Sequence, residues 1–174
     1  MRLRQLCIED AEGMLEWMHD PTINCNFRFD AAAYNLEQAK DFILKAKDAY
    51  KEGKTYHWAI TEDGKEYLGT ISLKDIDLEN KNAEYAICLR KCAMGKGIAY
   101  EATQYVLQYA FSELELHRVY LNVLSDNEKA IHLYERCGFQ FEGEWKEHLY
   151  LKGKYRSLKW YGIQKEEWMK QWKR

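Results

Sequence analysis

The sequence predicts an α/β (α+β) fold, in which one domain of residues 1–174 is built around a mixed, mostly antiparallel sheet of about seven strands flanked by helices. Three observations lead to this prediction. Hydrophobic residues (47%) and charged residues (31%) are balanced as in an ordinary globular protein, which excludes a disordered chain. A single proline, no low-complexity linker and no fixed repeat leave nothing to mark a domain boundary. The hydrophobic period alternates between helical and strand-like stretches.

The first third of the chain is predicted to form a strand and two helices. Residues 1–6 have the composition of a short strand, and Asp10 is placed to cap a helix that stops at Asp20-Pro21. A second helix is predicted over residues 36–51 because its apolar positions share one face, and Gly53 follows as a helix end.

The middle of the chain changes to a strand pattern. Residues 56–61, 67–77 and 83–89 are rich in aromatic and β-branched side chains, which favour strands. The segments 62–64 (Glu-Asp-Gly) and 80–82 (Asn-Lys-Asn) have the residues of tight turns. Three consecutive antiparallel strands are therefore expected.

The second half alternates helix and strand and ends in a hairpin. A long helix is predicted over 97–114, a strand over 119–124, and a helix over 127–137 that Gly138 ends. Two further strands and a short helix rich in tryptophan then complete the order of elements, at about 140–150, 155–164 and the C-terminus.

Composition also limits the partners. With 26 basic and 28 acidic side chains the net charge is -2, so we expect no binding to nucleic acid or to an anionic membrane. No apolar run approaches the roughly 18 residues of a membrane span, and charged residues occupy the N-terminus where a signal peptide would be apolar. The five cysteines form no C-x-x-C pair, so we expect reduced thiols, no metal site and a cytoplasmic protein.

The segment from Arg90 to Ala99 (RKCAMGKGIA) lies between a predicted strand and the long helix. Its glycines allow backbone N–H groups to approach a ligand, and the first turn of the helix adds unpaired donors, so a phosphate is the natural guest. The motif of nucleoside-triphosphate loops is absent because Ile98 follows Gly97, and a dinucleotide fingerprint lacks its third glycine at Tyr100. A glycine turn without a ligand remains the alternative.

A second block, Asn127 to Phe139 (NEKAIHLYERCGF), favours a loop that binds a ligand over a turn that binds none. Together the two blocks resemble the GNAT superfamily of acetyl-CoA-dependent N-acetyltransferases, with its signatures (Q/R)-x-x-G-x-(G/A) and N-x-x-[SA]-x-x-[LF]-Y-x-x-x-GF. The order of predicted elements is similar to that of the ribosomal-protein and small-amine branch of this superfamily.

The resemblance implies a GNAT-type domain that uses acetyl-CoA as co-substrate and no metal. It implies that the cofactor is bound by Ile87, Leu89, Met94, Gly95, Lys96, Gly97, Ile98, Ala99, Asn127, Ala130 and Tyr134. Met94 departs from the family pattern, since a methionine cannot donate a hydrogen bond to the pyrophosphate. That contribution would come from the backbone or from Arg90, Lys91 or Lys96.

The resemblance also implies two catalytic residues. Tyr134 would return a proton to the departing thiolate, and the alternative is that it is a core aromatic. Glu84 would remove a proton from the incoming ammonium, and the alternative is a strand carboxylate in a salt bridge. In another branch the base lies at the position of Asn122, which cannot serve.

The acceptor is expected to be a primary amine, on a small molecule or a peptide, that enters between the two N-terminal helices and the last hairpin. The stretch from Glu16 to Pro21 (EWMHDP) looks like the start of amino-sugar nucleotide N-acetyltransferases, while polyamines and protein N-termini remain open. A CoA-binding sensor without turnover and an NAD-binding domain are the rival classes. The aromatic residues near the C-terminus, among them Trp145 and Trp172, could wall the acceptor pocket or form a homodimer.

Overall fold

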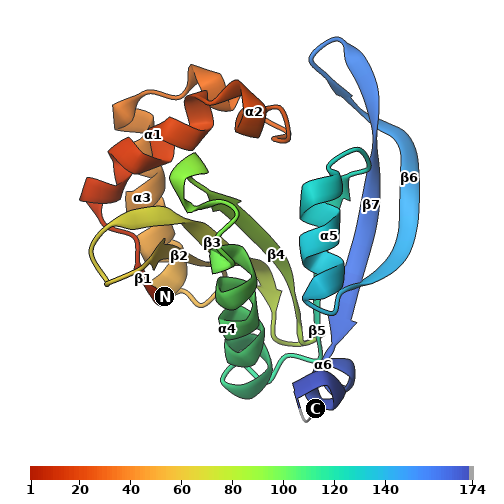
Figure 1. Ribbon diagram of the computed structural model, residues 1–174. Helices are drawn as coiled ribbons and strands as arrows, with labels where there is room; N and C mark the ends of the chain where they lie inside the picture. Colours follow the sequence, from red (N-terminus) through yellow and green to blue (C-terminus); the bar gives the residue numbers. More distant parts are fainter. Residues whose placement is uncertain (173–174) are drawn as a thin grey trace.

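The computed structural model describes residues 1–172, and in that part of the chain seven strands form one sheet in the order β1-β2-β3-β4-β5-β7-β6 (Figure 1). Neighbouring strands are antiparallel except β4 and β5, which are parallel. The mixed, mostly antiparallel sheet predicted from the sequence is thereby confirmed. The strands are β1 (Arg2–Gln5), β2 (Tyr56–Thr61), β3 (Tyr67–Asp77), β4 (Asn82–Leu89), β5 (Arg118–Leu124), β6 (Gln140–Leu151) and β7 (Lys154–Gln164).

Helices cover both faces of the sheet. The helices are α1 (Ala11–His19), α2 (Pro21–Asn24), α3 (Leu36–Lys51), α4 (Ile98–Ser112), α5 (Glu128–Arg136) and α6 (Lys165–Trp172). One buried cluster joins α1 and α3 to the sheet, and a second, larger cluster joins α4 and α5 to the opposite face. Figure 1 shows α1 to α3 on one side of the molecule, and α5 beside the long β6–β7 hairpin on the other. Because residues of β4, α4 and α5 share the larger cluster, their packing fixes the relative positions of these three elements.

Most helix ends follow the local signals in the sequence. The Asn35 side chain caps α3 by accepting a hydrogen bond from the Gln38 amide (2.9 Å), and the Gln38 side chain accepts one from the Asn35 amide (2.9 Å). Gly53 has the left-handed φ of +70° expected of a residue that ends this helix. The Asn127 side chain accepts a hydrogen bond from the Ala130 amide (3.3 Å), which confirms it as the cap of α5.

Of two local predictions about the first helix, one is wrong and one is confirmed. The Asp10 side chain does not cap α1: its carboxylate is held by Arg4 (2.7 Å) and accepts from the Cys7 amide (2.9 Å), inside a turn that precedes the helix. The helix does stop at Asp20-Pro21, because α1 ends at His19 and Asp20 is extended, but a second helix that the sequence did not indicate begins at once. Asp20 caps a further short helix, α2, in which Pro21 occupies the first turn, where its missing N–H costs nothing.

The sheet forks between its two parallel strands. β4 and β5 are paired only at Asn82–Arg118, Ala83–Val119 and Glu84–Tyr120, although β4 runs on to Leu89 and β5 to Leu124. Beyond Glu84 the facing edges of the two strands therefore carry peptide groups without partners across the gap. Such an edge can bind an extended ligand by adding a strand-like set of hydrogen bonds.

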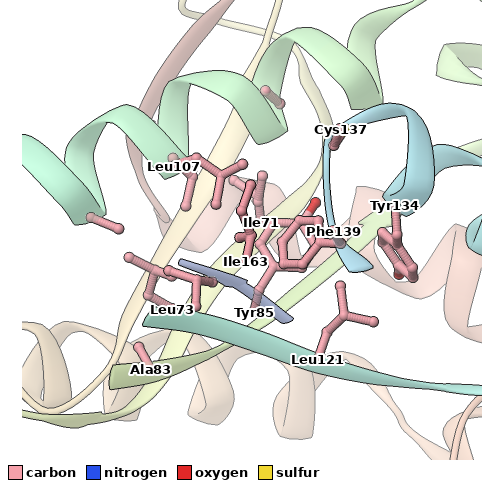
Figure 2. Packing of buried hydrophobic residues seen from close by; sticks show 14 of the residues in the cluster. Ile71, Leu73, Ala83, Tyr85, Leu107, Leu121, Tyr134, Cys137, Phe139 and Ile163 are labelled. Atoms are coloured by element: carbon pink, nitrogen blue, oxygen red, sulfur yellow. The ribbon is translucent and has the colours of Figure 1, made fainter. Parts of the chain in front are cut away.

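The core next to this fork is aromatic. Figure 2 shows Tyr85, Tyr134 and Phe139 close together beside Leu121, with Leu107 and Ile71 further along. Tyr134 packs edge-on against both Tyr85 (ring centroids 5.9 Å apart) and Phe139 (6.1 Å). The α5 helix is thereby fixed against β4 at the point where β4 and β5 separate.

The C-terminal aromatic residues lie in different environments. Trp168 is buried against Phe111 of α4, whereas Trp145 is half-exposed on β6 and stacks on Trp160. The side chain of Trp172 lies outside the described residues, as do residues 173–174 of the predicted domain. Core packing accounts for Trp168. No helix among the described residues is long and apolar enough to cross a membrane.

Candidate active site

The glycine loop before α4 presents an open cradle of backbone donors. Gly95 (φ +75°) and Gly97 (φ +80°) both have left-handed backbones, and a Cβ placed on either would meet no atom within 4 Å. Gly97 is the N-cap of α4, so the first amides of the helix point out of its end. Within the described residues the Gly95, Lys96 and Gly97 amides make no hydrogen bond. An anion placed here would find unpaired N–H groups and the positive end of a helix dipole.

The side-chain charges around this loop are not equally available. Arg90 is held by Glu16 (2.7 and 2.8 Å), Glu66 (3.1 Å) and the Tyr67 carbonyl (2.8 Å), so it is not free to bind a phosphate. Lys91 lies 3.8 Å from Asp20 and is largely exposed. Lys96 has no ion pair in the described chain, and Met94 is 44% exposed beside it. Lys96 is therefore the basic side chain that the loop leaves unengaged.

Tyr134 lies at the fork with a hydroxyl that no described residue binds. The side chain as a whole is buried, but its oxygen is not fully enclosed, so the hydroxyl retains contact with the surface. Burial raises the pKa of Tyr134, which keeps the phenol protonated at neutral pH. A protonated and unpartnered hydroxyl beside the open strand edges is suited to donate a proton there.

The two faces of β4 past the fork have different characters. Tyr85, Ile87 and Leu89 point toward α4 and α5, where Leu89 is buried and Ile87 is half-buried. Glu84 and Cys88 point toward the opposite face. Burial raises the pKa of Cys88, so its thiol is neutral and a poor nucleophile.

Glu84 is surrounded by donors. Its Oε1 atom lies 3.2 Å from Lys74 Nζ, 3.6 Å from an Arg28 guanidinium nitrogen and 3.3 Å from Asn122 Nδ2, and its side chain is only 14% exposed. Lys74 is its cross-strand partner on β3, and Arg28 reaches it from the loop after α2. The carboxylate thus lies at the base of the fork, on the face that α1 and α3 cover.

A hydrogen bond joins the β6–β7 hairpin to the N-terminal helices. Lys152, in the turn of the β6–β7 hairpin, donates a hydrogen bond to the Asn24 Oδ1 atom of α2 at 2.9 Å. Asn24 is itself fixed, because its amide nitrogen donates to the Met18 carbonyl (2.9 Å). Through this bond the turn of the hairpin is held against α2, the helix that precedes the Arg28 loop.

Local motifs identified part of this site and missed the rest. The glycine loop and Tyr134 belong to contiguous sequence blocks, whereas Arg28, Lys74 and Lys152 belong to none. Lys74 could have been found only from the register of β3 on β4, which places it opposite Glu84. On β2, His57 lies on the face that carries Glu84 and contacts Ser72, whereas Trp58 packs on the other face against Tyr109. In the described part of the chain, no group of three or more His, Cys, Asp or Glu residues could hold a metal ion.

A sheet that forks between two parallel strands, with an open glycine loop on one side and a carboxylate on the other, defines the class of GNAT-fold acetyltransferases. Solved structures agree. A crystal structure of spermidine N-acetyltransferase from Vibrio cholerae in complex with CoA and spermine superposes with a TM-score of 0.86, covers 97% of both chains and is 25% identical. A probable acetyltransferase superposes with the same TM-score at 30% identity, over 95% of this chain and 93% of the other.

The chain belongs to the acetyltransferase (GNAT) domain family, whose model matches residues 1–140. Curated relatives include a spermidine N(1)-acetyltransferase of Vibrio cholerae, 29% identical over 89% of this chain and 90% of the relative. A putative ribosomal N-acetyltransferase of Bacillus subtilis is 40% identical over 58% of this chain and 55% of its own. The chain is thus an N-acetyltransferase, and acetyl transfer to an amine is its reaction.

Proposed function

We propose that this enzyme transfers the acetyl group of acetyl-CoA to a primary amine on a small molecule, and that the residues predicted from the sequence carry the reaction. The observation that carries the proposal is the fork between β4 and β5, with Tyr134 on one face and Glu84 on the other. A thioester inserted between the strands would place its sulfur near a proton donor, and the acceptor would approach from the opposite face.

The donor site is proposed at the glycine loop. The amides of Gly95, Lys96 and Gly97 are free to bind the pyrophosphate, and the open space over both glycines allows close approach. Ile98 and Ala99 begin the helix whose dipole favours the anion. Ile87 and Leu89 line the β4 edge along which the pantetheine arm would run, and Asn127 and Ala130 would border it at the start of α5. The residues present therefore fit acetyl-CoA, with Met94 as the one weak position.

The chemistry needs one base and one acid. An amine arrives as an ammonium ion at neutral pH, so Glu84 would accept its proton, directly or through a water. The amine nitrogen then bonds to the acetyl carbon as the carbon–sulfur bond breaks. Tyr134 would protonate the departing thiolate, and the second proton that the acetylated nitrogen loses would return the phenolate to its neutral form. Burial raises the proton affinity of phenolate and thiolate alike, so the transfer between them stays feasible in this enclosed position.

The names of the relatives support a small amine acceptor. Two are spermidine acetyltransferases, from Vibrio cholerae and Escherichia coli, each 29% identical over about nine tenths of this chain. The alternatives of a sensor without turnover and of an amino-sugar nucleotide enzyme are not favoured by these names. The homodimer predicted through the C-terminal aromatics remains a proposal, supported by the exposure of Trp145, Tyr150 and Tyr155 on the hairpin.

Calorimetric titration with acetyl-CoA, followed by a free-thiol assay over a panel of amines, tests the proposal. We expect saturable acetyl-CoA binding and thiol release that depends on an acceptor. Binding without release for any amine would favour a sensor, and absence of acetyl-CoA binding would refute the donor site.

A further inference from the structure

The face of the fork that receives the acceptor carries more positive than negative charge. Glu84 is its one carboxylate at the fork, and it faces both Lys74 (3.2 Å) and Arg28 (3.6 Å). Within the described residues neither cation pairs with any other carboxylate. Both remain partly exposed, Lys74 by 29% and Arg28 by 46% of the side chain. Two cations sharing one carboxylate leave a net positive charge that a ligand can reach.

A third cation lies where the turn of the hairpin meets α2. The Lys152 ammonium bonds to the neutral amide oxygen of Asn24, at 2.9 Å, and forms no ion pair in the described chain. The carboxylates of Asp75 and Asp77 lie near Tyr120, the β5 partner of Glu84, whose pKa is raised by burial and, to a smaller extent, by Glu84 and these two acids. Neither acid forms an ion pair with Lys74 or Arg28 in the described chain.

The uncharged polar groups of this face are donors as well. Asn122 points its amide nitrogen at Glu84 (3.3 Å). The indole N–H of Trp160, its partner on β7, lacks an acceptor in the described chain, but it is fully enclosed and no ligand reaches it. Apart from Glu84, the face thus offers hydrogen-bond donors and positive charge.

We propose that the acceptor is a primary amine that also carries an anionic group, a phosphate or a carboxylate, bound by Arg28 and Lys74 while its amine faces Glu84. This inference rests on the proposed function and names its substrate class. A polycation would meet repulsion from both side chains, whereas an anion would satisfy them. Binding the anion would also draw the two cations away from Glu84 and leave its carboxylate free to accept the proton of the amine.

Matched pairs of acceptors test the charge requirement. Putrescine and 4-aminobutyrate differ by the exchange of one aminomethyl group for a carboxylate, and glucosamine and glucosamine 6-phosphate differ by a phosphate. At saturating acetyl-CoA we expect kcat/KM, measured by thiol release, to be roughly ten- to hundredfold higher for the anionic member of at least one pair, as for a charge-assisted contact. The pair that shows the preference distinguishes carboxylate from phosphate.

The outcomes separate the two proposals. Acetyl-CoA binding and thiol release with any of the four amines, or with spermidine, uphold the acetyltransferase function. The anionic acceptor is overturned if neither pair shows a preference for its anionic member, if spermidine is used better than both anionic amines, or if neither anionic amine is turned over.

Variants locate the anion site. Arg28→Gln and Lys74→Gln are expected to lower kcat/KM for the preferred anionic acceptor roughly ten- to hundredfold relative to kcat/KM for its uncharged or cationic match, with an unchanged KM for acetyl-CoA. Lys74→Arg should retain most of the preference because it keeps the charge. Lys45→Gln, on the exposed side of α3, is the control and should change nothing. An equal loss for both members of a pair would show a structural role and overturn the assignment.

Discussion

Arg90 and Glu16 form a two-pronged ion pair across 74 residues of sequence, with guanidinium nitrogens 2.7 and 2.8 Å from the two carboxylate oxygens. The pair joins α1 to the residue that precedes the glycine loop. Because Glu66 and the Tyr67 carbonyl occupy another nitrogen, Arg90 holds the loop in place but does not reach into it. The work of binding a phosphate with a side chain consequently falls to Lys96.

We expect Lys96→Ala to raise the KM for acetyl-CoA about five- to tenfold, the effect of one exposed charge-assisted contact, with kcat nearly unchanged. Lys91→Ala is the matched control, since Lys91 lies within 3.8 Å of Asp20 and its removal should have a smaller effect. Steady-state kinetics at a fixed acceptor concentration measure both. Equal effects of the two variants would contradict the distinction.

Met94 offers a test in the opposite direction. It is 44% exposed at the position where the family motif has a hydrogen-bonding side chain, so replacing it should cost little stability. Met94→Gln should lower the Kd for acetyl-CoA by roughly two- to tenfold, the value of one added neutral hydrogen bond. Calorimetric titration measures this directly. No gain in affinity would mean that the backbone amides already satisfy the pyrophosphate.

The fold was predictable because its signals are local. The strand pattern of residues 56–61, the capping residue Asn127 and the helix-ending Gly53 each depend on neighbours in sequence. Asp10 was mispredicted for the opposite reason: its partner Arg4 lies on β1, and a strong ion pair outweighs a helix cap. The short helix α2 was missed because a proline was taken to end helical structure, although Pro is favoured in a first turn.

In the candidate site, too, the residues with local sequence signals were predictable and those placed by distant parts of the chain were not. The loop residues and Tyr134 lie in two contiguous blocks that a sequence motif can describe. The environment of Glu84 depends on strand register and on a loop that returns from α2, which bring Lys74, Asn122 and Arg28 to one oxygen. No single window of sequence contains these three residues, so the charge of the acceptor face could not be predicted.

His57 should make the stability of the protein depend on pH. Burial, with a smaller effect of Lys74, lowers the pKa of His57 to about 4, and its Nδ1 lies 2.7 Å from Ser72 Oγ. The unfolded chain, with an ordinary pKa near 6.5, binds the proton more readily, so stability is full above about pH 6.5 and falls as the pH drops toward 4. The full effect is about 3 kcal/mol.

Chemical denaturation at pH 7.5 and pH 5 measures this dependence. His57→Gln cannot be protonated, so the variant should lose less stability than the wild type on going from pH 7.5 to pH 5. His132, which is exposed on α5, provides the control substitution. An identical pH dependence in the His57 variant and the wild type would exclude the buried histidine as its source.

Glu84→Gln should lower kcat by about two orders of magnitude and remove the rise of the rate with pH that a carboxylate base produces. Asn122 permits a sharper test, because its amide nitrogen lies 3.3 Å from the Glu84 carboxylate. Adding Asn122→Asp to the Glu84→Gln variant returns a carboxylate to nearly the same place and should restore part of the rate. If the Glu84→Gln variant alone keeps the wild-type pH profile, Glu84 is not the base and serves only in its salt bridges.

Tyr134→Phe separates the proton donor from the core aromatic. Its hydroxyl has no partner among the described residues, so its loss should leave the free energy of unfolding nearly unchanged and lower kcat about a hundredfold at constant KM for acetyl-CoA. Tyr85→Phe is the matched control. That hydroxyl is buried and bonded to Thr103 Oγ1 at 2.7 Å, so its removal should lower stability by about 1 kcal/mol and leave kcat largely intact. The two variants delete the same atom from adjacent rings, and only a proton donor at Tyr134 predicts that the variant that remains stable is the inactive one.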